Sequence, residues 1–141
     1  MKWYFASRTR HQKKIHALSE FLKKQGEEIV SDWIYTDSQT LMPYTENLAA
    51  SQDLSERIVT SILDCDNFVL ISDPEGTDMF IELGIALART ASKSPSIYII
   101  GKYSKRSLMQ LHPSTIHLET IEELFKQHQI DHSEIELPLL D

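Results

Sequence analysis

The segment NFVLISDPEGTDMFIELGIALA, residues 67–88, combines the two patterns that decide the fold. Its first part, NFVLIS (67–72), is a continuous apolar run between Asp66 and Asp73, which is typical of a strand buried on both faces. After a turn, apolar side chains recur at helical spacing over about residues 78–91. A buried strand that leads directly into a helix is half of a parallel β-α-β unit.

The same alternation of strands and helices continues along the whole chain. We expect strands at 2–6, 27–30, 67–72, 96–101 and 115–119, and helices at 11–24, 53–64, 78–91 and 121–128. Ser51 or Asp53 is the expected cap of the second helix. The pattern predicts an α/β fold of the flavodoxin/Rossmann-like type, a small three-layer sandwich with a parallel sheet of four or five strands. Residues 34–52 show no clear period, and so long a segment inside a compact domain is usually functional or mobile.

The length and composition indicate one domain with one core. The 141 residues suit a single domain at 1–130, followed by a tail at 131–141 that should dock on a partner subunit or fray. The net charge of −7 argues against a nucleic-acid polymer as partner, and the chain lacks the run of about 18 apolar residues that a membrane span needs. With no signal-peptide pattern and a single Cys65, expected to be a small buried hydrophobe, the sequence indicates the cytoplasm.

The candidate site lies at the carboxyl ends of the strands, where open parallel sheets bind their ligands. The first strand ends at Ser7 and Arg8, the second at Asp32 and Trp33, and the third in the loop 73–78. We expect these three loops to line one crevice, which brings together a hydroxyl, a guanidinium, an indole and several carboxylates. The indole of Trp33 either stacks on a nucleobase or packs in the core.

Two arginines, Arg8 and Arg10, lie just before the first helix. The N-terminus of a helix offers free amides and a positive dipole end, so these side chains form either a phosphate site or an ordinary solvated turn. The sequence contains neither the P-loop pattern nor the dinucleotide fingerprint. Its six histidines show no metal-ligand spacing, so no metal site is predicted.

A carboxylate, Glu82, interrupts the apolar pattern of the predicted helix. In a helix that starts near Asp78, Glu82 lies in the second turn, and its side chain points back toward the crevice. Two interpretations remain open. Glu82 is either a solvent-facing glutamate of the first turns, or a partly desolvated carboxylate whose pKa is raised and which is placed for chemistry.

Several motifs, taken in order, are similar to one family. They are WYFASR (3–8), VSDWI (30–34), DCDNFVLIS (64–72), GTDMFIELGIALA (76–88), SIYIIGKYS (96–104) and HPSTIHLETIEEL (112–124). The most specific is GTDMFIELGIALA, which matches a G-T pattern followed by E-L-G-x-A. Over residues 2–125 the chain resembles the nucleoside 2-deoxyribosyltransferase family, including its relatives that hydrolyse nucleoside 5′-monophosphates.

The resemblance implies a function and a set of roles. Glu82 matches the family's nucleophile, which attacks the anomeric carbon of the sugar, displaces the base and forms a glycosyl-enzyme ester. Tyr4 matches the tyrosine that orients this nucleophile, while Ser7 and Arg8 match the loop that holds the phosphate in the monophosphate hydrolases. Contacts to the sugar and the base are implied for Asp73, Gly76, Thr77 and Asp78. The family needs no cofactor, and its sites near subunit interfaces imply a homodimer or a higher homo-oligomer.

One departure from the family keeps other functions open. Many members carry an aspartate eight residues before the position of Asp66, where this chain has Ile58. Glu56 or Asp53 would substitute only if the helix register differed. The first alternative is therefore a catalytically degenerate module that binds or senses a nucleotide. A second is an NAD glycohydrolase like those among Toll/interleukin-receptor-like domains, some of which cleave NAD with an equivalent glutamate.

Overall fold

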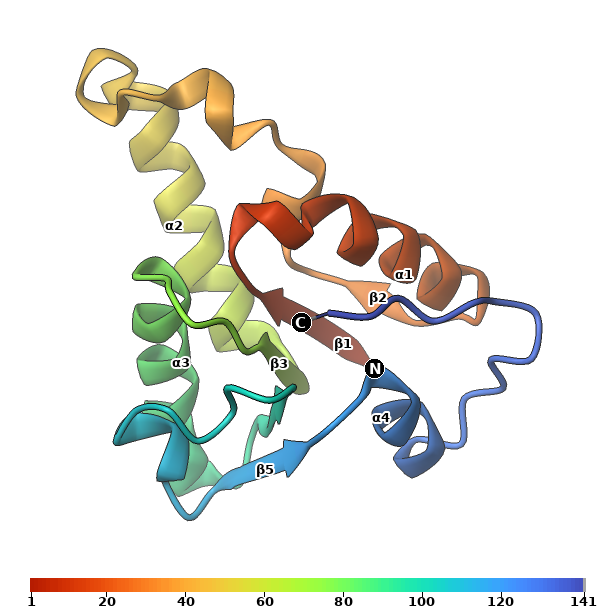
Figure 1. The fold of residues 1–141 in the computed structure, drawn as a ribbon. Helices are drawn as coiled ribbons and strands as arrows, with labels where there is room; N and C mark the ends of the chain where they lie inside the picture. The colour runs from red at the N-terminus through yellow and green to blue at the C-terminus, as the bar shows by residue number, and fades with distance from the viewer. Residues whose placement is uncertain (141) are drawn as a thin grey trace.

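The computed structural model describes residues 1–140, which form a five-stranded, all-parallel sheet with helices on both faces (Figure 1). The strand order is β2-β1-β3-β4-β5, one of the two common doubly wound orders. The elements are β1 (Lys2–Ala6), α1 (Gln12–Lys24), β2 (Glu28–Ile29), α2 (Leu48–Asp64), β3 (Asn67–Ile71), α3 (Asp78–Arg89), β4 (Ser96–Ile100), β5 (Thr115–Leu118) and α4 (Ile121–Gln127). The predicted three-layer α/β fold is thus confirmed.

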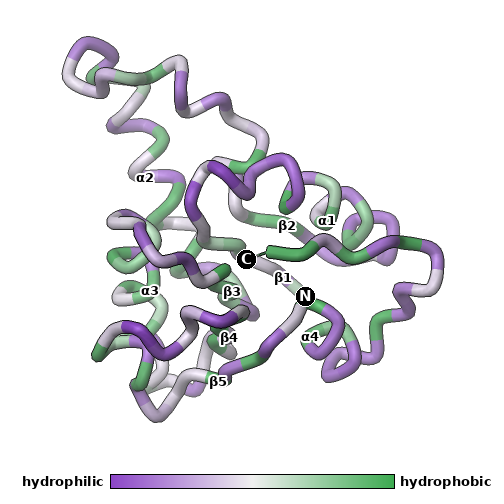
Figure 2. The backbone as a smooth tube through the Cα atoms, in the orientation of Figure 1, coloured by the Kyte–Doolittle hydropathy of each residue, from purple (hydrophilic) through white to green (hydrophobic). Residues whose placement is uncertain are grey.

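The two faces of the central strand β1 meet different helices. Helices α2 and α3 cover one face of the sheet, and α1 and α4 cover the other (Figure 1). On the α2/α3 face, the ring of Tyr4 stacks on that of Phe68 in β3, with the centroids 5.6 Å apart. Because successive residues of a strand point to opposite faces, Trp3 lies on the other face, against His128 at the end of α4. Figure 2 shows hydrophobic residues concentrated in the central strands that these helices enclose.

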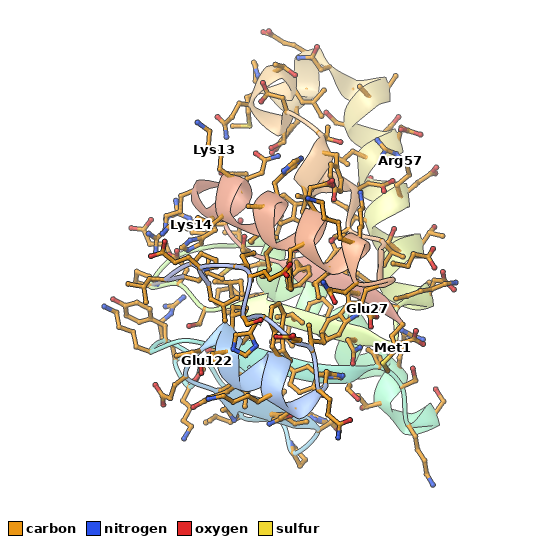
Figure 3. The ribbon with its side chains drawn as sticks, turned by 90° about the vertical axis from the view of Figure 1, so that its right-hand side faces the viewer. Met1, Lys13, Lys14, Glu27, Arg57 and Glu122 are labelled. Carbon is orange, nitrogen blue, oxygen red and sulfur yellow. The ribbon has the colours of Figure 1, made fainter. Side chains whose placement is uncertain are left out.

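The N-terminal edge of the sheet is tied together by one carboxylate. Glu27 accepts hydrogen bonds from the Met1 ammonium at 2.9 Å and from the indole Nε1 of Trp3 at 2.8 Å. Figure 3 labels Met1 and Glu27 near each other. The pKa of Glu27 is lowered, because these bonds together outweigh the opposing effect of burial. This anchor lies at the edge opposite to the one where ligands of parallel sheets bind.

Several predicted boundaries need correction. The predicted strand 27–30 is only Glu28–Ile29, and the helix predicted to begin at Asp53 begins at Leu48. Ser51 is therefore not a cap: it lies inside the first turn, where its Oγ donates to the carbonyl of Asn47 at 2.8 Å. The run Leu48-Ala49-Ala50 has high helix propensity, and this extends the helix ahead of the polar residues that resembled caps. Upstream, the region without a period forms three short 3-10 turns, Asp32–Tyr35, Ser38–Leu41 and Tyr44–Glu46.

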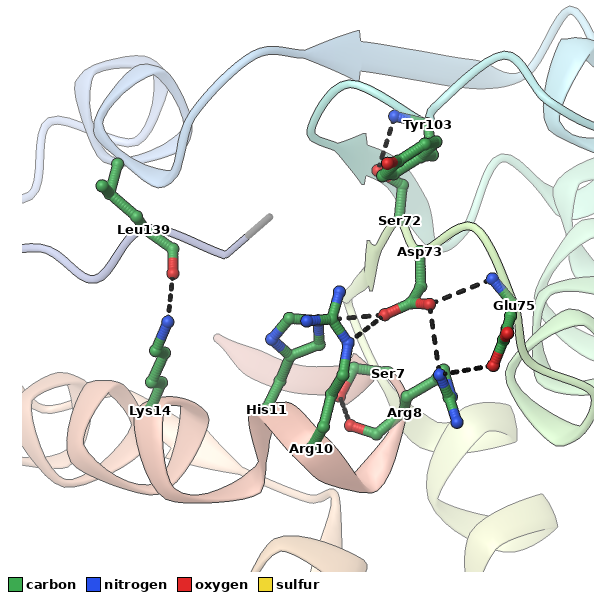
Figure 4. Close-up of polar contacts among 10 residues, drawn as sticks. All are labelled: Ser7, Arg8, Arg10, His11, Lys14, Ser72, Asp73, Glu75, Tyr103 and Leu139. Carbon is green, nitrogen blue, oxygen red and sulfur yellow. Dashed lines mark hydrogen bonds and ion pairs between the residues drawn. The ribbon is translucent and has the colours of Figure 1, made fainter.

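The end of the chain returns to the body of the domain. The Lys14 ammonium of α1 donates to the carbonyl of Leu139 at 2.6 Å (Figure 4), and the side chain of Leu140 is buried. The Leu140 carbonyl lies 3.6 Å from where a Cβ on Gly101 would be, just after β4. Within residues 1–140, no helix is both long and apolar enough to cross a membrane.

Candidate functional site

Glu82 and Tyr4 form a buried pair beneath the carboxyl edge of the sheet. Glu82 comes from the second turn of α3, and Tyr4 from the middle of β1; the Tyr4 hydroxyl donates to Glu82 Oε1. Glu82 is 8 % exposed and Tyr4 is fully buried, so Glu82 is not a solvent-facing glutamate. Oε2 of Glu82 has no hydrogen-bond partner within residues 1–140, so one carboxylate oxygen is held and the other is left open.

The environment of Glu82 holds its pKa near neutrality. Burial raises the pKa of this carboxyl from 4.5 to about 7, the hydrogen bond from Tyr4 lowers it, and the nearby charge of Asp78 raises it. For Tyr4, burial and the adjacent carboxylate raise the pKa well above 10, so its hydroxyl stays protonated as a donor. A carboxyl with a pKa near the working pH, held by a fixed donor, is characteristic of catalytic groups.

Glu82 lies in the wall of a cavity of about 370 Å³. The lining residues come from the β1–α1 loop, the 3-10 turns, α2 and α3: Ser7, Thr9, Trp33, Ser38, Leu41, Tyr44, Ser51, Gln52, Leu54, Ser55, Ile58, Asp78 and Glu82. This volume is within the range of small-molecule sites. Of the predicted site residues, the cavity brings together Ser7, Trp33, Asp78 and Glu82, with Tyr4 bonded to Glu82.

Trp33 is a rigid part of this wall. Its indole Nε1 donates to the carbonyl of Phe5 at 2.7 Å, and the side chain is 6 % exposed. The backbone beside it is held by the Gln12 amide, whose Nε2 lies 2.8–3.2 Å from three carbonyl oxygens, those of Trp33, Ile34 and Thr36. Trp33 therefore belongs to the core and also lines the cavity, and stacking of its indole on a nucleobase stays a prediction.

The predicted phosphate site contains a buried carboxylate. Asp73 is fully buried, and it contacts Arg10 Nε at 2.6 Å, His11 Nε2 at 3.3 Å and Arg8 Nη1 at 3.6 Å (Figure 4). Arg8 also pairs with Glu75 at 2.9 Å. Burial opposes ionisation of Asp73, but the Glu75 amide, Arg10 and His11 together lower its pKa. Arg8, Arg10 and Asp73 thus form a cluster, and none of the three lines the cavity. That these residues bind the substrate stays a prediction.

The other predicted residues have local structural partners. Asp32 pairs with Arg57 of α2 at 3.0 Å and does not line the cavity. Gly76 has φ +124°, a backbone conformation that residues with a side chain rarely adopt, and a Cβ there would also crowd the Met79 side chain, whose Cε would lie 2.7 Å away. Thr77 precedes α3 at the N-cap position. Substrate contacts by these residues stay predictions.

Much of the cavity wall was missed by sequence reasoning. Ser38, Leu41, Tyr44, Ser51, Gln52, Leu54 and Ser55 all line it, and all lie in or just after the segment without a period. The length of that segment was the one available signal of function. Ile58 also lines the cavity, whereas Asp53 and Glu56 do not. Asp53 instead pairs with Arg57 at 3.0 Å, so neither carboxylate replaces the expected aspartate in the cavity wall.

The fold is similar to a solved structure, the CMP N-glycosidase BcmB of Clostridium botulinum. The TM-score is 0.54 and the identity 16 %, over 93 % of this chain and 100 % of that chain. No family model matches the sequence, and no curated protein does. At this identity the likeness shows the fold, in agreement with the resemblance to nucleoside 2-deoxyribosyltransferases, and the chemistry must be argued from the site itself.

Proposed function

We propose that the protein cleaves the N-glycosidic bond of a nucleoside or a nucleoside 5′-monophosphate. The observation that carries the proposal is the carboxylate of Glu82, buried in the wall of a cavity with one oxygen bonded by Tyr4 and the other open. The similarity to a CMP N-glycosidase supports the same class of substrate. Glu82 occupies the position at which the family resemblance places a nucleophile.

In the proposed reaction, the open oxygen of Glu82 attacks the anomeric carbon, C1′, of the sugar. The bond between C1′ and the base nitrogen breaks, and the base leaves with the bonding electrons and takes up one proton from the solvent. Water then attacks the glycosyl ester; its oxygen becomes the hydroxyl at C1′ of the released sugar, the carboxylate is returned, and one proton goes back to the solvent. If a second base attacked instead of water, the outcome would be transfer. We favour hydrolysis, because transfer requires a site that holds a second base and keeps water out.

Tyr4 has two effects on this nucleophile. Its hydroxyl fixes the orientation of the carboxylate, and its hydrogen bond stabilises the ionised form that burial disfavours. Since the ring is stacked on Phe68 and fully buried, the donor is preorganised and pays little entropy when the substrate binds.

Chromatographic detection of free base tests the proposal. The protein is incubated with nucleosides, their 5′-monophosphates and NAD, beside the Glu82→Gln variant. We expect release of one base, reduced at least about 1,000-fold in the variant because the nucleophile is lost. Glu56→Gln is the matched control, since it removes the same charge from an exposed position of α2 outside the cavity. Release that survives in Glu82→Gln would refute the role of Glu82, and nicotinamide release alone would identify a NAD glycohydrolase.

One observation favours a second candidate, a nucleotide-binding module without turnover. The cavity wall contains Ile58 where many family members carry an aspartate, and no carboxylate of α2 lines it within the described residues. This candidate predicts a ligand-dependent rise in melting temperature by mass action, with no base released.

A homodimer or higher homo-oligomer is part of the proposal. Exposed apolar side chains on the outer helices, Val59 and Leu63 of α2 and Ile81 of α3, support self-association. Light scattering coupled to size-exclusion chromatography measures the mass directly. A monomer at micromolar concentration would refute this part.

A further inference from the structure

We infer that the site selects an uncharged nucleoside over the corresponding 5′-monophosphate, because acidic and neutral groups line the cavity and the arginines beside it are committed to Asp73. The inference rests on the proposed function and narrows its substrate class. It departs from the CMP specificity that the structural neighbour's name states.

The first support is the charge of the cavity lining. Among residues 1–140, no Arg, Lys or His lines the cavity, whereas two carboxylates do, Asp78 and Glu82. These two lie four residues apart on α3 and therefore share one face of that helix. The remaining polar lining groups are neutral hydroxyls and amides, from Ser7, Thr9, Ser38, Tyr44, Ser51, Gln52 and Ser55. Such groups can pair with sugar hydroxyls and base edges, but a phosphate dianion here would face like charge without a counter-ion.

The second support is the pairing of the two arginines in the β1–α1 loop, whose neighbours Ser7 and Thr9 line the cavity. Arg8 and Arg10 contact Asp73, and Arg8 also contacts Glu75, so two cations face two carboxylates (Figure 4). Asp73 is fully buried. If either guanidinium turned away to bind a phosphate, the buried carboxylate of Asp73 would lose one of its partners, which costs stability although the arginines themselves are partly exposed. A phosphate bound by these arginines would therefore share each cation with a carboxylate that already neutralises it, which weakens the attraction.

The third support concerns the helix end that opens into the cavity. A helix N-terminus can bind a phosphate through its free amides. In α3, however, the first residue is Asp78, so the positive end of the helix already has an anionic neighbour in the cavity wall. Specificity here would come from repulsion of the charged competitor rather than from extra contacts to the neutral ligand.

Calorimetric titration of the Glu82→Gln variant tests the inference without turnover. The ligands are matched pairs, each common nucleoside and 2′-deoxynucleoside with its own 5′-monophosphate. We expect the recognised nucleoside to bind at least about tenfold more tightly than its monophosphate. The variant has already lost one cavity charge, so it weakens the expected preference and makes the test stricter. Equal or tighter binding of the monophosphate overturns the inference, as does binding of neither ligand.

Two further variants test whether the arginine–Asp73 pairing causes the preference for the nucleoside. Asp73→Asn removes the buried negative charge that Arg8 and Arg10 share, so it should raise the affinity for the monophosphate alone and reduce the ratio of nucleoside affinity to monophosphate affinity at least about threefold. Should Asp73→Asn not fold, Arg8→Gln serves instead: it should leave the ratio of the two affinities unchanged, and a loss confined to the monophosphate overturns the inference. Preferential nucleoside binding by wild-type protein that releases no base refutes the proposed function but supports this inference.

Discussion

The raised pKa of Glu82 must appear in the pH dependence of stability, independently of any substrate. Glu82 has a pKa of about 7 in the folded protein, above its ordinary 4.5. The folded state therefore binds more protons than the unfolded state between these values, and stability falls as the pH rises through this window. The contribution of protonated Glu82 is fully present below pH 4.5 and is lost as the pH rises through about 7. Glu82→Gln replaces the carboxyl with a neutral group at every pH.

The size of the effect follows from the shift. Each pKa unit is worth about 1.4 kcal/mol, so at pH 8 the buried carboxylate costs the wild type about 3 kcal/mol, and at pH 5 less than about 1 kcal/mol. The unfolding free energy of Glu82→Gln, relative to wild type, should thus rise by about 2–3 kcal/mol from pH 5 to pH 8. Urea denaturation at both pH values measures this difference.

Comparing two pH values removes the constant effect of the substitution on packing and hydrogen bonding. Glu56→Gln, at an exposed position of α2, should give a difference that changes little with pH. The difference in unfolding free energy between Glu82→Gln and wild type must rise from pH 5 to pH 8. If it stays constant or falls as the pH rises, then Glu82 is not a desolvated carboxyl and the reasoning fails.

Three other substitutions have effects that the structure specifies. Tyr4→Phe removes a hydrogen bond that both stabilises ionised Glu82 and orients it, so the pKa of Glu82 should rise and kcat/KM at pH 7 should fall about 5- to 50-fold. The part of the loss that comes from the pKa should recover toward pH 9, and a loss of the same size at pH 7 and pH 9 would contradict that effect. Gln12→Ala removes the amide that holds the backbone at Trp33, so we expect KM to rise severalfold while kcat changes little. A fall in kcat as large as the rise in KM would refute this. Asp73→Asn should lower the free energy of unfolding by about 2 kcal/mol at pH 7. The effect is moderate because solvent screens the charges of the half-exposed arginines. Because the pKa of Asp73 is lowered, that cost should shrink as the pH falls below 3.8, and urea curves showing a growing cost in acid would contradict it.

The sequence predicted the framework because buried parallel strands leave a strong local signal. The runs at β1, β3 and β4 are short, continuous and apolar, and the helices between them show a clear period. The start of α2 was misplaced because Ser51 and Asp53 resemble caps, whereas the residues ahead of them extend the helix without a capping side chain. Cap chemistry and helix propensity favour different starts here, and the propensity of Leu48-Ala49-Ala50 prevails.

The candidate site likewise has one part that the sequence predicted and one part that it did not. Glu82 was singled out because it interrupts the apolar pattern of a regular helix, whose geometry directs the side chain toward the carboxyl edge of the sheet. Its contact with Tyr4 was implied by the family resemblance alone, and the hydrogen bond between them agrees with that. Most of the opposite wall, from Ser38 to Ser55, belongs to irregular backbone or to a misplaced helix start, so no periodicity could reveal it. The pairing of Arg8 and Arg10 with Asp73 was missed because it joins residues more than 60 positions apart.

The way the cavity is built has a consequence for how the ligand specificity of this protein can be altered. The reacting pair is supplied by the first strand and the third helix, while most of the opposite wall comes from one continuous piece of chain between Trp33 and Ile58. Replacing that piece would alter which molecule fits without touching the carboxylate or its tyrosine. The segment Trp33–Ile58 is therefore the natural unit to exchange or randomise when new ligands are sought on this scaffold, with the strand and helix kept as the constant part.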